Sequence, residues 1–300
     1  MGKRLARVLL TTVVVVVVLA LILGAAGLAV TRRSFPKTGG EIQVAGLEAP
    51  VEVVRDGWGV PHIYAETSHD LFFAQGYVHA QDRFWQMDFW RHIGSGRLAE
   101  LFGESQLESD RFLRTFGWAR VAAQELGQLD PESLAILEAY TQGVNAYLAE
   151  RQGSALSLEY AVLKLTNAGY EPEPWQPVHT LTWGKVMAWN LGGNMDEEYR
   201  RAGLLGALSP AEVSDLYPPY PGDHPVIVPG FGTWEGESAL PDLDPALLRR
   251  VAPGLAALAK PPAALEELAS TLGAAIGSNS WVIAGQKQAT GEPILAHDPH

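Results

Sequence analysis

Residues 277–284 read Gly-Ser-Asn-Ser-Trp-Val-Ile-Ala, and the interpretation of the whole chain depends on this stretch. On local grounds it is a loop-to-strand junction, in which a glycine and small polar residues precede an aromatic and β-branched run. Residues 286–292 predict a polar turn and residues 293–296 a second strand. A two-stranded hairpin is marginally stable alone. We therefore expect the chain, which ends at His300, to stop within a domain.

Upstream of this hairpin, local signals predict a second hairpin and several helices. Residues 51–64 alternate around a glycine-containing turn and predict two short strands. Thr67 resembles the first residue of a capping box, before a helix over residues 69–92. Asp130 followed by proline predicts another helix start, and residues 209–212 form a second capping-box pattern.

The N-terminal segment indicates export from the cytoplasm. Residues 8–30 are apolar except for two threonines, and as a helix they would span ~34 Å, enough to cross a bilayer. Three basic residues precede this span and two follow it, which favours an N-in, C-out orientation. An uncleaved membrane anchor and a cleaved signal peptide both remain open, and a buried core helix is the third alternative. Either of the first two would export everything after residue 33.

Composition excludes several classes of protein. The chain of 300 residues has 34 acidic and 22 basic residues, so its net charge of −12 argues against a nucleic-acid partner. Apolar residues make up 47%, which is enough for a sizeable core. Cysteine is absent, which excludes disulfides, thiolate metal sites and cysteine nucleophiles. Length alone is consistent with about two domains.

Three common catalytic motifs are missing from the sequence. It has no Gly-x-x-x-x-Gly-Lys-Ser/Thr loop for phosphates, no His-Glu-x-x-His zinc helix and no Gly-x-Ser-x-Gly nucleophile elbow. His297 and His300 could be metal ligands, but this spacing on an extended segment does not bring both side chains to one face.

Two ordered blocks of motifs carry a resemblance to a known family. The first block comprises Arg55-Asp56, Gly59-Val60-Pro61-His62-Ile63, Gln75-Gly76-Tyr77-Val78-His79-Ala80-Gln81-Asp82-Arg83, Gln86-Met87-Asp88 and Gly96-Arg97-Leu98-Ala99-Glu100. The second block is Gly277-Ser278-Asn279-Ser280-Trp281-Val282, followed by Asp298-Pro299-His300. Together these blocks resemble the penicillin acylase family, which includes penicillin amidases, cephalosporin acylases and acyl-homoserine-lactone acylases. Residues 189–201 are similar to the family's segment before the end of its small subunit.

The resemblance implies an α/β fold, the four-layer α/β/β/α sandwich of N-terminal-nucleophile hydrolases, incomplete here and wrapped by a helical small subunit. It implies four regions: residues 1–33 as anchor or signal, 34–239 as the small (alpha) subunit, 240–277 as a spacer, and 278–300 as the start of the large (beta) subunit. Both subunits would come from one precursor.

The resemblance also implies the chemistry. The precursor would cut itself between Gly277 and Ser278, so that Ser278 becomes the first residue of the large subunit and the nucleophile. A serine hydroxyl needs an adjacent base, and the freed α-amine, with an ordinary pKa of ~7.7–8.0, can serve as one. The family's oxyanion hole uses an asparagine side chain that would lie beyond residue 300. The 300 residues alone would therefore be an incomplete enzyme.

Further residues acquire expected roles from the same resemblance. His300, 22 residues after Ser278, would orient or polarise the nucleophile, with a structural histidine as the alternative. Met187 and Trp189 would line the acyl pocket, although ordinary core packing is the competing interpretation. Asp82, Arg83 and Arg97 are instead expected to form a buried or partly buried ion-pair network, since charges in a core need partners.

Family members often hold one calcium ion, and the resemblance aligns its small-subunit ligand with Glu198, or alternatively Glu197. Carboxylate oxygens suit calcium, but a solvated acidic helix start is the competing interpretation. The other ligands would lie beyond residue 300, and no organic cofactor is expected.

The sequence is thus interpreted as a membrane-tethered, extracytoplasmic acylase precursor. It would hydrolyse linear amides of small N-acyl compounds, of penicillin, cephalosporin or acyl-homoserine-lactone type, through an acyl-enzyme on Ser278. One alternative is a non-catalytic, membrane-anchored binding protein that retains the acylase scaffold. Another is a self-cleaving protein with no small-molecule substrate.

Overall fold

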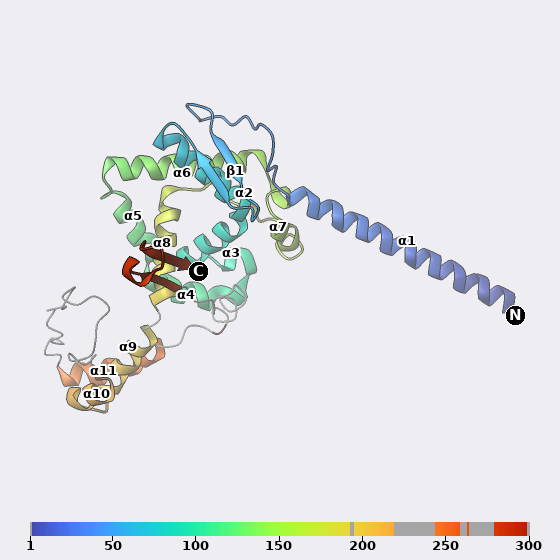
Figure 1. Ribbon diagram of the computed structural model, residues 1–300. Coiled ribbons are helices and arrows are strands. Elements are labelled where there is room, and N and C mark those ends of the chain that lie inside the picture. Colours follow the sequence, from blue (N-terminus) through green and yellow to red (C-terminus); the bar gives the residue numbers. More distant parts are fainter. Residues whose placement is uncertain (1, 193–194, 219–243, 259–262, 264–278, 299–300) are drawn as a thin grey trace. The chain divides into compact units, whose positions relative to one another are not determined.

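The computed structural model describes residues 2–192, 195–218, 244–258, 263 and 279–298 (Figure 1). The contacts divide the chain into two compact units, Met1–Met187 and Ala188–His300, each of which is described here by itself. Gly277, Ser278 and His300 lie outside the described residues.

Helix α1 (Gly2–Ser34) contains the predicted apolar span. Its part from Arg7 to Ser34 is long and apolar enough to cross a membrane, and the span is exposed along its length. This exposure disagrees with a buried core helix, because such a helix would be covered by the protein. Length and composition do not distinguish an anchor from a signal sequence.

The predicted N-terminal hairpin is confirmed. Strands β1 (Glu52–Arg55) and β2 (Pro61–Tyr64) pair antiparallel, with Glu52 opposite Tyr64. Asp56 closes the turn between them, because its carboxylate accepts hydrogen bonds from the backbone N–H groups of Trp58 and Val60. These two bonds lower the pKa of Asp56, which is the physical signature of a carboxylate that holds a turn.

Helix α2 (Ser68–Ser95) is the longest element of the globular body and covers the predicted range of 69–92. Thr67 caps its start by accepting a hydrogen bond from Asp70 N. The predicted box is only half formed, because the Asp70 carboxylate reaches Glu48 N and Ala49 N instead. The helix ends at Gly96, whose φ of 61° is the left-handed conformation that favours glycine.

The core of the first unit lies where α2 packs on α6 (Pro131–Glu150), which starts at the predicted Asp130 cap (Figure 1). Two glycines set how closely these helices approach. A Cβ atom at Gly76 would overlap the carbonyl oxygen of Tyr140, and one at Gly143 would overlap that of Phe73. Each helix therefore presents a glycine to the backbone of the other, so that the two backbones touch.

Shorter helices surround this pair. They are α3 (Ala99–Phe102), η1 (Glu104–Gln106), α4 (Leu107–Phe116), α5 (Trp118–Leu126), η2 (Gly153–Ala155), α7 (Leu158–Leu163) and α8 (Pro177–Gly192). Helix α8 crosses from the first compact unit into the second.

The described part of the second unit contains the end of α8, helices α9, α10 and α11, and a hairpin whose turn includes η3 (Gly285–Lys287). Helices α9 (Met195–Leu204) and α11 (Pro245–Leu258) contact one another, and α10 (Pro210–Leu216) begins at the predicted capping box of Ser209 and Glu212. Strands β3 (Asn279–Ile283) and β4 (Ile294–Asp298) form the predicted C-terminal hairpin.

Candidate functional site

The hairpin β3–β4 carries the sequence positions that flank the predicted nucleophile. The strands pair antiparallel, with Asn279 opposite Asp298 and Ser280 opposite His297. Asn279 directly follows Ser278 in the chain, and His300 comes two residues after Asp298. The start of β3 and the end of β4 lie at the same end of this two-stranded sheet. From these two points the chain continues into the segments that contain the two predicted residues. The roles of Gly277, Ser278 and His300 remain predictions, because these residues lie outside the described part of the chain.

The same hairpin exposes apolar side chains on both of its faces. Side chains alternate along a strand, so Trp281 and Val282 of β3 point to opposite faces, and they are 51% and 72% exposed. Leu295 of β4 is 70% exposed. A strand pair with apolar residues on both faces suits a sheet that is covered on each side, as in a layered sandwich.

The two residues predicted to line an acyl pocket lie on α8. Met187 and Trp189 are both half-buried. They fall on either side of the boundary between the two compact units, at Met187 and Ala188. Partial burial agrees with a core or a pocket role, so both interpretations stay open.

The predicted calcium ligand Glu198 lies on α9 and is exposed, and the neighbouring Glu197 forms an ion pair with Arg201. Glu198 offers a hard oxygen donor, which fits calcium chemistry. One carboxylate does not make a calcium site, however, since calcium takes six to eight oxygen ligands. Within the described residues, the cluster with three ligand-type side chains in mutual reach lies elsewhere, at Glu48, His69 and Asp70.

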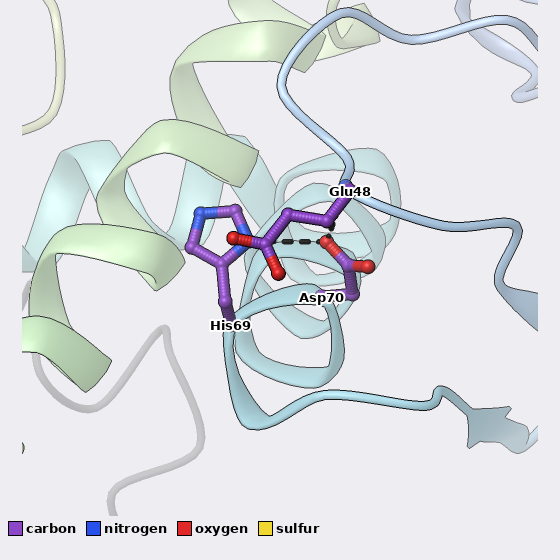
Figure 2. A group of neighbouring side chains, drawn as sticks. All are labelled: Glu48, His69 and Asp70. Atoms are coloured by element: carbon purple, nitrogen blue, oxygen red, sulfur yellow. Dashed lines mark hydrogen bonds and ion pairs between the residues drawn. The ribbon is translucent and has the colours of Figure 1, made fainter.

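That cluster joins the segment before β1 to the start of α2 (Figure 2). Asp70 is fully buried, and its two carboxylate oxygens accept hydrogen bonds from Glu48 N and Ala49 N, each at 2.9 Å. His69 Nδ1 lies 3.0 Å from Asp70 Oδ1. Burial raises the pKa of Asp70, but these hydrogen bonds outweigh it and lower the pKa overall. The Asp70 carboxylate is therefore already used as a structural link.

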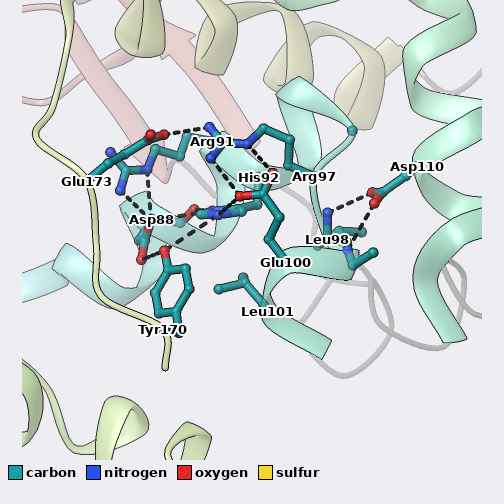
Figure 3. A network of polar contacts seen from close by, with 12 residues as sticks. Asp88, Arg91, His92, Arg97, Leu98, Glu100, Leu101, Asp110, Tyr170 and Glu173 are labelled. Atoms are coloured by element: carbon teal, nitrogen blue, oxygen red, sulfur yellow. Dashed lines mark hydrogen bonds and ion pairs between the residues drawn. The ribbon is translucent and has the colours of Figure 1, made fainter. Parts of the chain in front are cut away.

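A second polar cluster lies around Asp88, in the interior of the first unit (Figure 3). Arg91 Nε donates to Asp88 Oδ1 at 2.7 Å, and the hydroxyls of Tyr160 and Tyr170 donate to Oδ2 at 2.6 and 2.7 Å. Burial would raise the pKa of Asp88, but hydrogen bonding to His92 and the charge of Arg91 prevail and lower it to about 2. Asp88 is thus ionised, saturated with donors and unsuited to proton transfer at neutral pH.

Arg97 extends this polar cluster toward the surface (Figure 3). Its Nη1 donates to Glu173 at 2.5 Å, and Nε and Nη2 donate to Glu100 at 2.7 and 2.6 Å. Hydrogen bonding to Arg97 lowers the pKa of Glu100. The ion-pair role predicted for Arg97 is therefore confirmed.

The other two charges expected in that network behave differently. Asp82 forms a two-point contact with Arg55, both distances being 2.9 Å, which joins α2 to β1 at the surface. The prediction for Arg83 is wrong: it is exposed, and the described residues offer it no ion pair. Its φ of −140° departs from helical geometry, so it marks a kink in α2.

A cavity of about 780 Å³ lies between residues 37–55 and α2. Its polar side chains from α2 already have partners. The Tyr77 hydroxyl donates to Glu150, and Gln81 donates to the Lys37 carbonyl while accepting from Arg55. The cavity therefore lacks an activated nucleophile in its described lining.

Sequence reasoning missed the convergence of Tyr160 and Tyr170 on Asp88. The hydroxyls come from positions 72 and 82 residues further along the chain, so no local pattern connects them to Asp88. The signal that was available is the motif Gln86-Met87-Asp88 itself, which contains the buried carboxylate.

Comparison with known proteins agrees with the resemblance. A family model described as penicillin amidase matches residues 50–300. Penicillin acylase 2 proenzyme of a Pseudomonas species (strain SE83) is 38% identical over 269 residues, covering 89% of this chain and 32% of that protein. The acyl-homoserine lactone acylase QuiP of Pseudomonas aeruginosa is 35% identical over 270 residues, covering 89% of this chain and 29% of that protein.

Among solved structures, a thermostable penicillin G acylase from Alcaligenes faecalis matches with a TM-score of 0.49 and 27% identity. The match covers 60% of this chain and 97% of that one. Similarity of this degree does not by itself establish a shared fold. The present chain spans about a third of the length of the curated relatives it matches. The match of one family model across residues 50–300 nevertheless decides the ancestry, and the chain belongs to the penicillin amidase family.

Proposed function

We propose that this chain is part of an autoprocessed serine amidohydrolase that cleaves linear amides of small N-acyl compounds. The precursor breaks its own Gly277–Ser278 bond, and Ser278 then carries a free α-amine. Family membership across residues 50–300 is the observation that carries this proposal, because that range includes the Gly277-Ser278-Asn279-Ser280-Trp281 motif.

The reaction follows from the groups at that new terminus. The Ser278 hydroxyl oxygen attacks the acyl carbon while its proton passes to the α-amine, whose ordinary pKa of ~7.7–8.0 leaves much of it neutral near pH 8. The C–N bond breaks, the amine leaves with that proton, and an ester on Ser278 remains. Water then attacks the ester and releases the carboxylic acid. His300 is proposed to orient the hydroxyl, and the pairing of Asn279 with Asp298, the described residues next to these two segments, supports the proposal.

The substrate class is inferred from relatives. One is named for penicillin and the other for acyl-homoserine lactones, and both substrates carry an acyl group in a linear amide. We propose the same class for this protein, with Met187 and Trp189 in the acyl pocket. The four-layer sandwich, a calcium ion held partly by Glu198 and an oxyanion asparagine after residue 300 complete the proposal. The exposed apolar faces of β3–β4 support the sandwich.

The proposed location is the outer side of a membrane, with α1 as the anchor. The length and apolar character of residues 7–34 support this placement.

Intact mass spectrometry of the full-length protein tests the proposal. We expect a fragment that begins at Ser278, and we expect Ser278→Ala to abolish both this cut and amide hydrolysis. Ser280→Ala, which changes an exposed serine of β3 two positions further along the chain, is the matched control and should be cut normally. Continued cleavage of Ser278→Ala would refute the nucleophile. A stable, uncut wild-type protein would favour a binding protein that retains the scaffold.

A further inference from the structure

Helix α7 has apolar side chains on two faces, and one of those faces is open to solvent. Tyr160 and Leu163 are buried in the body. Leu158, Val162 and Leu165 are 38%, 61% and 84% exposed. These three residues follow the i, i+4, i+7 spacing, so they form one stripe along the helix and the turn after it. We call Leu158, Val162 and Leu165 the α7 stripe.

The α7 stripe lies beside the point where the apolar helix α1 meets the body. The end of α1 contacts η2 and α7 (Figure 1). Val30, Thr31 and Ser34 are half-buried there, whereas residues 7–29 of α1 are exposed. The body therefore begins at the last apolar residue of the span, with no spacer between the span and α7.

Hydrogen bonds fix this junction further. Arg151, which follows α6, donates from one Nη1 to the carbonyl oxygens of Arg33, Phe35 and Ala155, at 3.2 to 3.3 Å. The peptide carbonyls at the end of α1 and the segment before α7 are thus held by one guanidinium. The position of α7 relative to the span is set by these contacts.

Several charged side chains lie near the stripe in the sequence. Ser157 donates a hydrogen bond to Glu159, and Lys164 forms an ion pair with Glu171 at 2.8 Å. Arg32 and Arg33, at the end of α1, are exposed and basic. The Lys164–Glu171 pair is neutral as a unit, and the exposed, basic Arg32 and Arg33 suit a surface that meets lipid headgroups.

We propose that the α7 stripe is a second membrane contact, inserted into the headgroup region of the bilayer that α1 crosses. This inference rests on the proposed anchor. A span that ends at Val30 places the bilayer surface at that residue, and α7 packs at the same level. The exposed apolar side chains of α7 then face lipid instead of water. The body would lie with its α7 side on the membrane.

These 300 residues contain no cysteine, so a cysteine introduced among them is a distinct labelling position within this part of the protein. The full chain, embedded in lipid nanodiscs, is labelled with an environment-sensitive fluorophore at one introduced cysteine. The test positions are Val162→Cys and Leu165→Cys. Ala123→Cys is the matched control, because Ala123 is exposed and belongs to α5, a helix that lies away from α1 in the first unit (Figure 1). Leu21→Cys, in the middle of α1, reports on the anchor.

We expect blue-shifted emission at positions 162 and 165, and quenching by lipids that carry a spin label at the headgroup. The label at position 123 should stay water-exposed and unquenched. The label at position 21 should be quenched only by spin labels deep in the acyl chains. If position 21 lies in lipid while 162 and 165 behave like 123, the α7 contact is overturned and the anchor stands. If position 21 is also in water, both fail, and the acylase assignment of Ser278 is unaffected.

Discussion

The helical body and the C-terminal hairpin are opposite in their state of burial. In the body, several residues of the first motif block are enclosed: Ala80, Asp88 and Leu98 are each 2% exposed or less. In β3–β4 the motif residues Trp281 and Val282 are more than half exposed. The buried residues of the first block therefore build an interior, whereas Trp281 and Val282 of the second block are open to solvent.

This difference distinguishes two kinds of motif: one whose residues build the interior of the body, and one whose residues stay exposed. Asp88 and Arg97 are charged and look catalytic in isolation, yet each is saturated by internal partners. The hairpin is instead exposed, and the predicted nucleophile directly precedes its first strand in the sequence. Residue type alone would have pointed to Asp88 and Arg97, whose polar atoms are already used within the body.

The largest effect is expected from Asp88→Ala in the body. This substitution leaves the buried Arg91 cation and two tyrosine hydroxyls without their acceptor, which should cost about 3–5 kcal/mol of unfolding free energy. Chemical denaturation in detergent measures the loss. Asp82→Ala, which breaks a more exposed ion pair with Arg55, should cost only about 1 kcal/mol. Equal losses for both variants would contradict the structural role of Asp88.

A methyl group at the helix contact should have the next largest effect. Gly143→Ala forces the α6 backbone away from Phe73 and should destabilise the body by about 3 kcal/mol. Gly184→Ala, in α8, is the matched control because nothing lies within 4 Å of its Cβ position, and it should be neutral or slightly stabilising. Thermal unfolding compares them, and an unchanged midpoint for Gly143→Ala would disprove the close approach of α2 and α6.

Sequence patterns predicted the local structure correctly wherever a side chain contacts residues close to it in the chain. Thr67, Asp130 and Ser209 cap helices as predicted, because a side chain and the N–H groups it receives are two or three residues apart. Asp70 shows where such reasoning stops. Its carboxylate belongs to the predicted capping pattern, but folding brings Glu48 N and Ala49 N to it from 22 and 21 residues away.

The candidate site likewise has a part that local sequence patterns predict and a part that they do not. The motif around Ser278 could be recognised because its residues are contiguous, and the hairpin after it could be predicted from alternation. Arg83 was assigned wrongly, because Arg55 takes the neighbouring Asp82 and the kink at Arg83 leaves that side chain outside. The burial of charge depends on which distant segments meet, and no local spacing contains that information.

Acid should weaken the body through Asp88. The pKa of Asp88 is lowered from its ordinary value of 3.8 to about 2, so its ionised form is stabilised by folding. That contribution is complete above pH 4 and is lost as the pH falls through 2, a change of about 2 kcal/mol. Unfolding free energies measured from pH 5 to pH 2 should decline, and Asp88→Asn should flatten the curve. An equal decline in that variant would assign the effect to other carboxylates.

The smallest change in stability is expected from a substitution in the hairpin. This substitution tests the difference in burial between the hairpin and the body most directly. Val282→Ala in this chain should change stability by less than about 0.5 kcal/mol, because the side chain is 72% exposed. Val144→Ala removes the same methyl groups from a fully buried position and should cost about 2 kcal/mol. Denaturation midpoints compare the two valines. A large cost at Val282 would mean that the hairpin already packs against a partner within this chain.

The hydrogen bonds that gather the segment after α1 have a mechanical consequence. Arg151 holds the carbonyls of residues 33 and 35, and Gln81 holds that of Lys37. A flexible linker would let the body rotate freely about α1. These hydrogen bonds instead restrain the chain within a few residues of the end of the span. With α1 as the proposed anchor, rotation of the first compact unit about the span would thereby be restricted, and that unit would keep a constant orientation relative to the membrane.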